Sequence, residues 1–320
     1  MLDINVITKD GVTNPSQLEG ALELAQSQNG ILWVNMRSYT DDEINLVTKT
    51  FNLHQIESES LKEEYTRPHL YEYKDHFHAN FTYLDIENDE LQPTEFHVFL
   101  AANYIITAGT DGCSDLVDQA IKRYLDMPEL VERGSYYALY LVVDLLTDTY
   151  IHTADDMDDQ VDSIEDEMSD HADRDTLQRL FKIKRKLFDL KRYMAPQRDV
   201  FNELARGAFH FVSDMHEPYF QDVYNRMSRV FDIIDTSRDI LSGTLDLYQS
   251  SVSNRLNDIM KILTVLAVIL GIFSFITGYF GMNVADFPKV SVWVLAGWSV
   301  FIAIIITAVL VLLFRKKGWL

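Results

Sequence analysis

Charged residues are missing from two long stretches in the last quarter of this 320-residue sequence. None occurs between Lys261 and Asp286, and none occurs between Lys289 and Arg315. Each stretch is long enough for a helix of about 20 residues to cross a hydrocarbon layer of roughly 30 Å. Core helices of soluble proteins are shorter and amphipathic. The two stretches therefore predict two transmembrane helices in a lipid bilayer.

Basic residues are also scarce, since 28 Lys and Arg stand against 49 Asp and Glu, which gives a formal net charge of −21. A nucleic-acid backbone needs a basic patch, so this balance argues against nucleic acid as a partner. The acidity suits a protein that concentrates or senses cations. It equally suits a cytosolic domain that is kept soluble by its charge.

Cysteine is nearly absent, because Cys113 is the single one. No intramolecular disulfide can form, which fits a reducing cytosol. The first ten residues lack a basic region followed by an apolar run, so we expect no signal peptide. The sequence has neither a GxxxxGK[ST] phosphate-binding run nor a nucleophile motif. It therefore predicts no enzyme and no organic cofactor.

The charges that flank the two apolar stretches predict their orientation. Arg255 and Lys261 precede the first stretch, and the basic tail at 315–320 follows the second. The connecting loop carries only Lys289 against Asp286. Because the basic side of a membrane protein faces the cytoplasm, we expect both termini inside. The protein would be a multi-pass protein of the cell (inner or plasma) membrane.

The first 135 residues have the pattern of a mixed α/β cytoplasmic domain. The apolar run 31–34 follows a glycine and predicts a buried strand, and the alternation over 77–83 predicts a half-buried one. The apolar segments 96–100 and 104–107 predict a hairpin.

Two segments of this domain carry helical spacing, Asp41–Phe51 and Ser114–Leu125, with Asp41 and Ser114 as expected N-caps. His76 and His78 could ligate a metal. Without a third ligand at a fixed spacing, we interpret them as ordinary strand-surface histidines.

From residue 136 the pattern is helical. Acidic residues gather at 155–167 and basic residues at 179–192, which predicts an antiparallel helix pair over 136–210 with a break near 171–174. One interpretation is that two solvated faces neutralise each other, although surface ion pairs add little stability. The other is an acidic surface that attracts divalent cations. We favour the first for individual residues.

Apolar residues recur at steps of three, four or seven from residue 217 into the first apolar stretch, and no proline occurs from Tyr219 to Phe287. This predicts one helix, a stalk at 217–261 that continues as a transmembrane helix at 262–283. At 1.5 Å per residue it exceeds roughly 90 Å. Such a long apolar stripe needs partners, so we expect self-association. A coiled structural stalk would carry the same stripe.

The first span ends in Gly281-Met282-Asn283, and the chain ends in the basic tail described above. With the stalk sequences at 218–224 and 250–254, this arrangement resembles the CorA-type family of divalent-cation transporters, most closely over residues 135–320. The resemblance implies a homopentameric funnel in which the first span of each subunit lines a central pore. The expected division of the chain is the α/β domain at 1–135, the helix pair at 136–210, the stalk at 217–261, the pore helix at 262–283, the extracytoplasmic loop at 284–290, the second transmembrane helix at 291–314 and the tail at 315–320.

The resemblance also assigns a selectivity filter to Gly281, Met282 and Asn283. Mg²⁺ releases its water reluctantly, so neutral oxygens that bind the hydrated ion suit it, and residues 262–283 contain no carboxylate. Met260 and Leu263 would form an apolar constriction, although packing against lipid or another helix explains them nearly as well. By analogy and by helical spacing, the pore-lining residues are Asn257, Met260, Leu263, Thr264, Ala267, Gly271, Ser274 and Gly278.

Two positions depart from the family pattern. Family members commonly carry acidic residues after the triplet, whereas here Asp286 alone would capture cations at the outer mouth. The family's regulatory metal site resembles a pair of aspartates that bridge neighbouring subunits. Asp222 matches the stalk position, but Ser60 stands where the second aspartate is expected. Glu59 could replace it, or gating by Mg²⁺ is weaker.

Three functions remain open. The first is passive uptake of Mg²⁺, with Co²⁺ and Ni²⁺ as further substrates and cytoplasmic Mg²⁺ as the gating ligand. The second is zinc transport or export within the same superfamily, against which Met282 argues. The third is a membrane-anchored scaffold that conducts nothing, which would need neither the Gly-Met-Asn triplet nor a span with hydroxyls and no charge.

Overall fold

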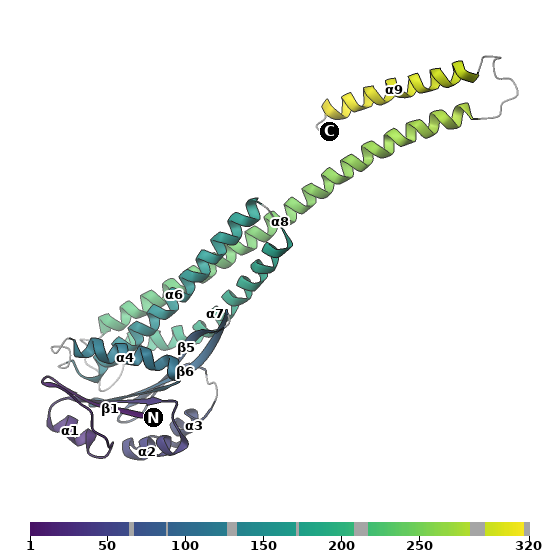
Figure 1. Cartoon of the computed structure of the whole chain (residues 1–320). Coiled ribbons are helices and arrows are strands. Elements are labelled where there is room, and N and C mark those ends of the chain that lie inside the picture. Colours follow the sequence, from purple (N-terminus) through teal and green to yellow (C-terminus); the bar gives the residue numbers. More distant parts are fainter. Residues whose placement is uncertain are drawn as a thin grey trace. The chain divides into compact units, whose positions relative to one another are not determined.

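The computed structural model describes residues 1–63, 67–87, 89–126, 133–170, 173–207, 217–281 and 292–316. The chain divides into two compact units, Met1–Ser242 and Gly243–Leu320. The first unit contains a sheet covered by helices on both faces, and the second contains two apolar helical segments (Figure 1).

The sheet of the first unit has seven strands in the order β2-β1-β3-β7-β6-β5-β4. Only β3 and β7 pair in parallel among the described strands; the other neighbours are antiparallel. The expected strand at 31–34 and the expected hairpin are confirmed as β3 and as β6–β7. The strands are β1 (Leu2–Thr8), β2 (Gly11–Thr13), β3 (Ile31–Arg37), β4 (His69–Glu72), β5 (Phe77–Glu87), β6 (Glu90–Leu100) and β7 (Tyr104–Gly109).

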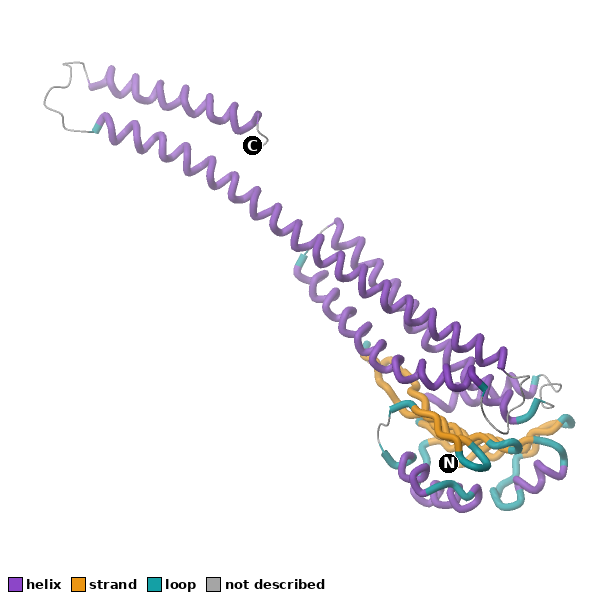
Figure 2. The backbone as a smooth tube through the Cα atoms, turned by 180° about the vertical axis from the view of Figure 1, so that it is seen from behind, coloured by secondary structure: helices purple, strands orange, loops and turns teal. Residues whose placement is uncertain are grey.

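Three short helices cover one face of the sheet, α1 (Ala21–Ser27), α2 (Asp41–Phe51) and α3 (Gln55–Ser60) (Figure 2). Because side chains alternate along a strand, every second residue of β3 meets this layer. Leu32 and Val34 pack there with Val47 of α2, and all three are fully buried.

The other face lies under α4 (Asp111–Leu125), α6 (Ser135–Asp170) and α7 (Arg174–Arg206). Trp33 of β3 points this way, makes an edge contact with Tyr124 of α4 and donates its indole N–H to the Thr107 hydroxyl at 3.2 Å. Trp33 belongs to the residues of β3 that alternate with Leu32 and Val34 and point to the opposite face. Both faces are therefore buried at the centre of the sheet.

The long helices of the first unit are joined by charge as well as by apolar packing. Helix α6 ends at Asp170 and helix α7 begins at Arg174. The break near 171–174 that the change of charge sign predicted is therefore in the right place. Arg179 of α7 pairs with Glu167 of α6. Helix α8 (Glu217–Phe280) contacts α6 through Arg226, which pairs with Asp144 and Asp148.

Both expected N-caps are wrong. Thr40 caps α2, with its hydroxyl accepting from the Glu43 amide and the Glu43 carboxylate accepting from the Thr40 amide. A hydroxyl at the preceding residue thus takes the role expected of Asp41. Helix α4 begins at Asp111, three residues before Ser114, whose hydroxyl donates to the Thr110 carbonyl.

The strand at 77–83 is also more buried than its alternation indicated, because the polar residues between its apolar ones are covered too. His78, Asn80 and Thr82 are at most 1% exposed. His76 and His78 are therefore not surface histidines. Polar groups that stay buried must find partners within the protein.

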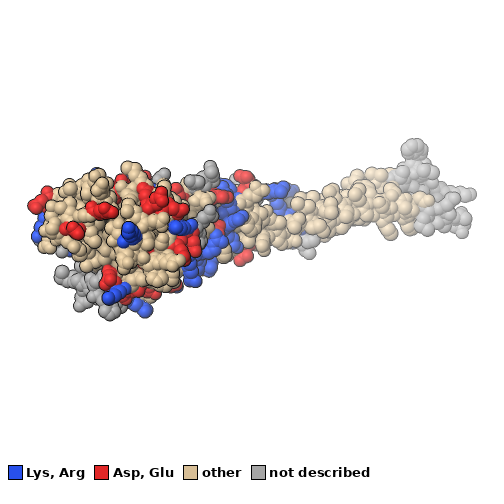
Figure 3. Space-filling view, turned by 90° about the horizontal axis from the view of Figure 1, so that it is seen from below, with Lys and Arg blue, Asp and Glu red and all other residues tan. Residues whose placement is uncertain are grey.

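The second unit holds the end of α8 and all of α9 (Val292–Lys316). Both helices are long and apolar enough to cross a membrane by length and composition. In the face seen in Figure 3, the apolar part of these helices shows neither blue nor red.

Candidate ion pathway on helix α8

Two threonine hydroxyl groups in the apolar segment of α8 are hydrogen-bonded within the helix. The Thr264 hydroxyl donates to the Met260 carbonyl at 2.7 Å, and the Thr277 hydroxyl donates to the Phe273 carbonyl at 2.8 Å. Such bonds to the preceding turn use the hydroxyl hydrogen, and the oxygen can still accept from an outside donor, such as a water molecule.

The eight residues expected to line a pore occupy one side of α8. With 3.6 residues per turn they fall within about 120° of the helix circumference. All eight are exposed in the single chain. They follow one another along the helix as Asn257, Met260, Leu263, Thr264, Ala267, Gly271, Ser274 and Gly278.

Within the apolar segment, the buried side of α8 lies elsewhere. Val265 and Ile276 are buried, as is Ala303 on α9. These two residues of α8 lie about 150° around the helix from the centre of the exposed pore-lining stripe. In this segment the stripe therefore faces away from the residues that α8 buries within its own chain.

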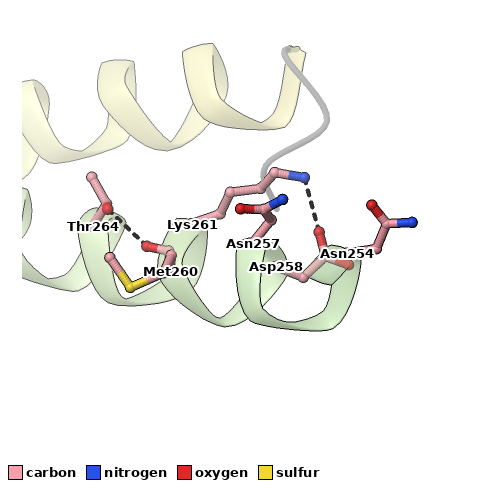
Figure 4. A pocket seen from close by; sticks show the side chains of 6 residues that line it. All are labelled: Asn254, Asn257, Asp258, Met260, Lys261 and Thr264. Carbon is pink, nitrogen blue, oxygen red and sulfur yellow. Dashed lines mark hydrogen bonds and ion pairs between the residues drawn. The ribbon is translucent and has the colours of Figure 1, made fainter. Parts of the chain in front are cut away.

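A cavity of about 560 Å³ lies beside the start of the apolar segment. Figure 4 shows the amino group of Lys261 turned toward Asp258, and their atoms Nζ and Oδ1 are 2.8 Å apart. Asn254 and Asn257 contribute neutral amides to the same cavity. The Lys261 ammonium group neutralises the carboxylate of Asp258, which is the single acidic one among the described residues that line this cavity. The other side-chain oxygens available to a cation here are neutral.

Neither the cavity nor the pairing of Asp258 with Lys261 was predicted from the sequence. The i, i+3 spacing of Asp258 and Lys261 was the signal that could have indicated the ion pair.

The expected filter lies at the opposite end of this segment, and only Gly281 of its three residues is described. Its amide donates to the Thr277 carbonyl at 2.9 Å, which continues the helical hydrogen bonding one residue past Phe280. A Cβ atom at Gly281 would lie 3.0 Å from that carbonyl oxygen, which is a tight contact. Met282, Asn283 and Asp286 lie outside the described residues.

The three positions of the expected regulatory site differ in exposure. Asp222 on α8 and Glu59 on α3 are exposed. Ser60 is 8% exposed, and its hydroxyl donates to the Glu57 carbonyl at 2.9 Å. Its side chain is therefore turned into its own helix, and Glu59 is the better placed of the two for a ligand from outside.

Within the described part of the chain, no group of three or more His, Cys, Asp or Glu side chains is arranged to hold a metal ion. The pore-lining stripe offers the amide of Asn257 and the hydroxyls of Thr264 and Ser274 instead. Oxygen ligands of this neutral kind can contact the water shell of a hard cation without binding it tightly enough to trap it.

A long helix running into an apolar segment, a second apolar helix and a neutral oxygen-bearing stripe are features of a membrane protein that passes cations. Sequence and structure comparisons agree with that class. The CorA-like Mg2+ transporter protein family matches residues 28–316. The chain belongs to this family, which is one of membrane transporters for divalent cations and not of enzymes.

Individual relatives support this membership. The "Cobalt/magnesium transport protein CorA" of Thermotoga maritima is 30% identical over 296 residues, covering 90% of this chain and 83% of the relative. The complete structure of the CorA magnesium transporter from Methanocaldococcus jannaschii aligns over 100% of this chain and 99% of its own, with a TM-score of 0.85 at 19% identity. The "Zinc transport protein ZntB" of Cronobacter sakazakii is 27% identical over 179 residues, covering 55% of this chain and 52% of the relative.

Proposed function

We propose that this protein is a passive channel for Mg²⁺ uptake, with Co²⁺ and Ni²⁺ as further substrates. The observation that carries the proposal is the pore-lining stripe of α8, which is free of charge, exposed, and turned away from the buried residues Val265 and Ile276 of the same segment. The identity to the cobalt/magnesium transport protein of Thermotoga maritima supports these ions.

Selection would take place at Gly281, Met282 and Asn283. Five Asn283 amides with the Gly281 carbonyls would form an oxygen ring that binds a hydrated ion, which avoids the cost of removing its water. Asp286 would raise the local cation concentration at this mouth. An inside-negative potential would drive entry with about 4.6 kcal/mol per 100 mV for a divalent ion, twice the value for one charge.

The pore would close at Met260 and Leu263. Both side chains are more than half exposed in the single chain, at 57% and 58%. Around a central axis, five copies of each would form an apolar ring that loses its water when the helices approach.

The family resemblance implies assembly as a homopentamer, and the same exposure is compatible with it. A helix face with Leu266, Leu270 and Phe273 exposed needs either lipid or another copy of the chain against it. In this arrangement both termini are cytoplasmic, as the flanking charges predict.

Regulation would come from a Mg²⁺ ion shared by Asp222 of one subunit and Glu59 of its neighbour. Their exposure leaves both carboxylates available to a second chain. Release of the ion would leave two negative charges close together and separate the subunits, which links Mg²⁺ binding to closure.

Zinc transport is the second candidate, because zinc transport proteins are 27% identical to this chain over about half its length. Uptake and export by such a pathway would both pass the same filter, and the ion gradients would decide the direction.

Flux into proteoliposomes with a panel of Mg²⁺, Co²⁺, Ni²⁺ and Zn²⁺ tests the function. Mg²⁺ flux is expected in the wild type and is lost in Asn283→Ala, with the oligomer intact by native mass spectrometry. Asn225→Ala, which removes an exposed amide far from the apolar segment, is the matched control and keeps wild-type flux. Wild-type flux in correctly inserted Asn283→Ala protein would reject the filter, and flux of Zn²⁺ alone would favour the second candidate.

A further inference from the structure

A group of histidines and glutamates is buried between the sheet and α3, on a face where the neighbouring strands bury apolar side chains. Three strands contribute to it, because His69, His78 and His97 lie on adjacent strands at the same side of the sheet. His78 and His97 are 1% and 0% exposed. An apolar residue would fill these positions at lower cost, so the buried imidazoles call for an explanation.

The central histidines are joined in a chain of hydrogen bonds. Glu95 Oε2 lies 3.1 Å from His97 Nε2, and His97 Nδ1 lies 3.1 Å from His78 Nε2. The ring of His78 stacks on Phe99 with centroids 4.3 Å apart, and the edge of His69 meets it at 5.2 Å.

The proton count of this chain follows from its ends. The Glu95 carboxylate accepts, so His97 Nε2 carries a proton and donates it. In the neutral state His97 Nδ1 then accepts from His78 Nε2–H. One added proton on His97 Nδ1 is accommodated when His78 changes tautomer and accepts. A second proton, on His78 itself, puts two N–H groups against each other at 3.1 Å, and the rings must separate.

We propose that Glu95, His97 and His78 form a proton-responsive latch that holds α3 and β4 on the sheet and releases them when the interior histidines become charged.

Apart from the latch, the described contacts of these elements are chiefly those of β4 with β5 and α7 and those of α3 with α2. Strand β4 has four residues and lies at the edge of the sheet, where it pairs with β5 alone among the described strands. Helix α3 has six residues, and Glu57 attaches it to the sheet side by accepting from His76 Nε2 at 2.9 Å. Short elements with few partners are the ones that open locally at low free-energy cost.

A path for protons leads to the latch from solvent. A cavity of about 370 Å³ lies between α3 and β4, and His69, Tyr71 and His78 contribute to its lining. Glu59 and Glu63 lie on its α3 side. His78 is thus buried by area but borders a space that water can enter.

The charged and titratable neighbours of His78 and His97 come from every element around them. Burial, and then the neighbouring imidazoles, hold the pKa of His78 well below its ordinary value. Burial lowers the pKa of His69 too. These groups are Glu57 and Glu59 of α3, Glu63 and Arg67 after it, His69 and Tyr71 of β4, Tyr73 and His76 before β5, Glu95 of β6, and Tyr39. Burial, and then Glu95, raise the pKa of Tyr39 to about 12.

The direction of the pH effect follows from these shifts. In the closed state His78 stays neutral, and in the open state it titrates near its ordinary value of 6.5. The open state therefore binds more protons at acid pH. Closure is fully stable above about pH 6.5 and is lost as the pH falls below it.

Hydrogen exchange of the full-length protein in lipid nanodiscs measures this opening, after correction for the intrinsic pH dependence of exchange. Between about pH 7.5 and pH 5.5, protection of α3 and β4 is expected to fall about tenfold for each histidine that charges only on opening, so about a hundredfold for His69 and His78 together. Protection of β3, at the sheet centre, should stay constant.

His78→Gln keeps a hydrogen-bonding side chain but cannot charge, so its pH response should shrink to about tenfold. His152→Gln changes an exposed histidine on α6 and should keep the wild-type response. If His78→Gln does not fold, His69→Gln gives the same reduction at the edge of the cavity. Constant protection of α3 and β4 in the wild type, or a full wild-type response in a folded His78→Gln protein, would overturn the latch, whatever the outcome of the flux measurements.

Discussion

In the unit Met1–Ser242 the large side chains of the central strands are buried, whereas in the unit Gly243–Leu320 most large apolar side chains are exposed. Phe99 of the sheet is 0% exposed, and Phe275 of α8 is 76% exposed. In water such an exposed surface costs about 25 cal/mol for each Å² of apolar area. A bilayer removes this cost.

The difference shows where each unit obtains its partners. In the sheet domain one chain supplies both sides of each contact, as when Trp33 meets Tyr124. Along the apolar segment of α8, most apolar side chains stay exposed, because the same chain does not cover them. The first unit should therefore respond to substitutions through its own stability, and the second through assembly and transport.

The largest effect is expected at Gly271. A Cβ atom there would meet nothing within 4 Å in the single chain, so we expect Gly271→Leu to leave the chain's own packing largely unchanged. In a pore, five leucines at one level would block the path, and we expect flux to fall by about 100-fold or more. Proteoliposome flux, with native mass spectrometry for assembly, measures this.

Gly297→Leu on α9 is the matched control, because a Cβ atom there also meets nothing within 4 Å. It should retain wild-type flux. Normal flux in an assembled Gly271→Leu protein would show that the stripe faces lipid. Contact with lipid alone would then explain why the apolar side chains of the second unit are exposed.

The next effect is expected in the first unit, at Arg226. Burial raises the pKa of Asp144 despite its pairing with Arg226. Arg226→Met leaves this carboxylate without a main partner, so the unit should lose about 1–3 kcal/mol of stability. The melting temperature would fall by roughly 2–10 °C.

Arg229→Met is the matched control, because Arg229 is exposed and lies three residues after Arg226 on the same helix. It should change the stability of the unit by at most about 0.5 kcal/mol. The deficit of Arg226→Met should shrink as the pH falls, because protonation removes the buried charge of Asp144. A deficit that is independent of pH would mean that lost packing, and not the charge, explains it.

The smallest effect concerns the contact between subunits. Asp222→Ala should raise the Mg²⁺ concentration that inhibits current in inside-out patches by about fivefold, as expected for a coupling of about 1 kcal/mol. Glu59→Gln should do the same, since either change removes one carboxylate of the pair.

Asp239→Ala changes another exposed aspartate of α8 and should leave inhibition unaltered. Unchanged inhibition in both Asp222→Ala and Glu59→Gln would show that this pair does not sense Mg²⁺.

The order of helices and strands could be predicted from local sequence patterns, because the spacing of apolar residues and the changes of charge sign depend only on neighbouring residues. The strand at 31–34, the hairpin at 96–107 and the end of α6 before residue 171 were placed in this way. Cap residues could not be placed, since Thr40 competes with the adjacent Asp41 and only the path of the backbone decides between them.

The candidate site shows a similar limit. The family resemblance and helical spacing together selected Asn257 through Gly278, and a regular helix puts them on one side of α8 because it fixes the angle between residues. Their role in lining a pore remains a prediction. The burial of His78 could not be predicted, since its cover comes from β4, β6 and α3, and alternation along β5 says nothing of what lies on either face. The filter at Asn283 remains a prediction.

The parallel pairing of β3 with β7 has a consequence for the synthesis of the chain. Leu32 lies beside Tyr104, so the centre of the sheet cannot close until about 70 further residues have been made. At about 5–20 residues per second this is a delay of roughly 4–14 s. The apolar segment that begins after Lys261 is made about 150 residues later still. The sheet can therefore complete its hydrogen bonding before the ribosome delivers the first helix that belongs in the membrane.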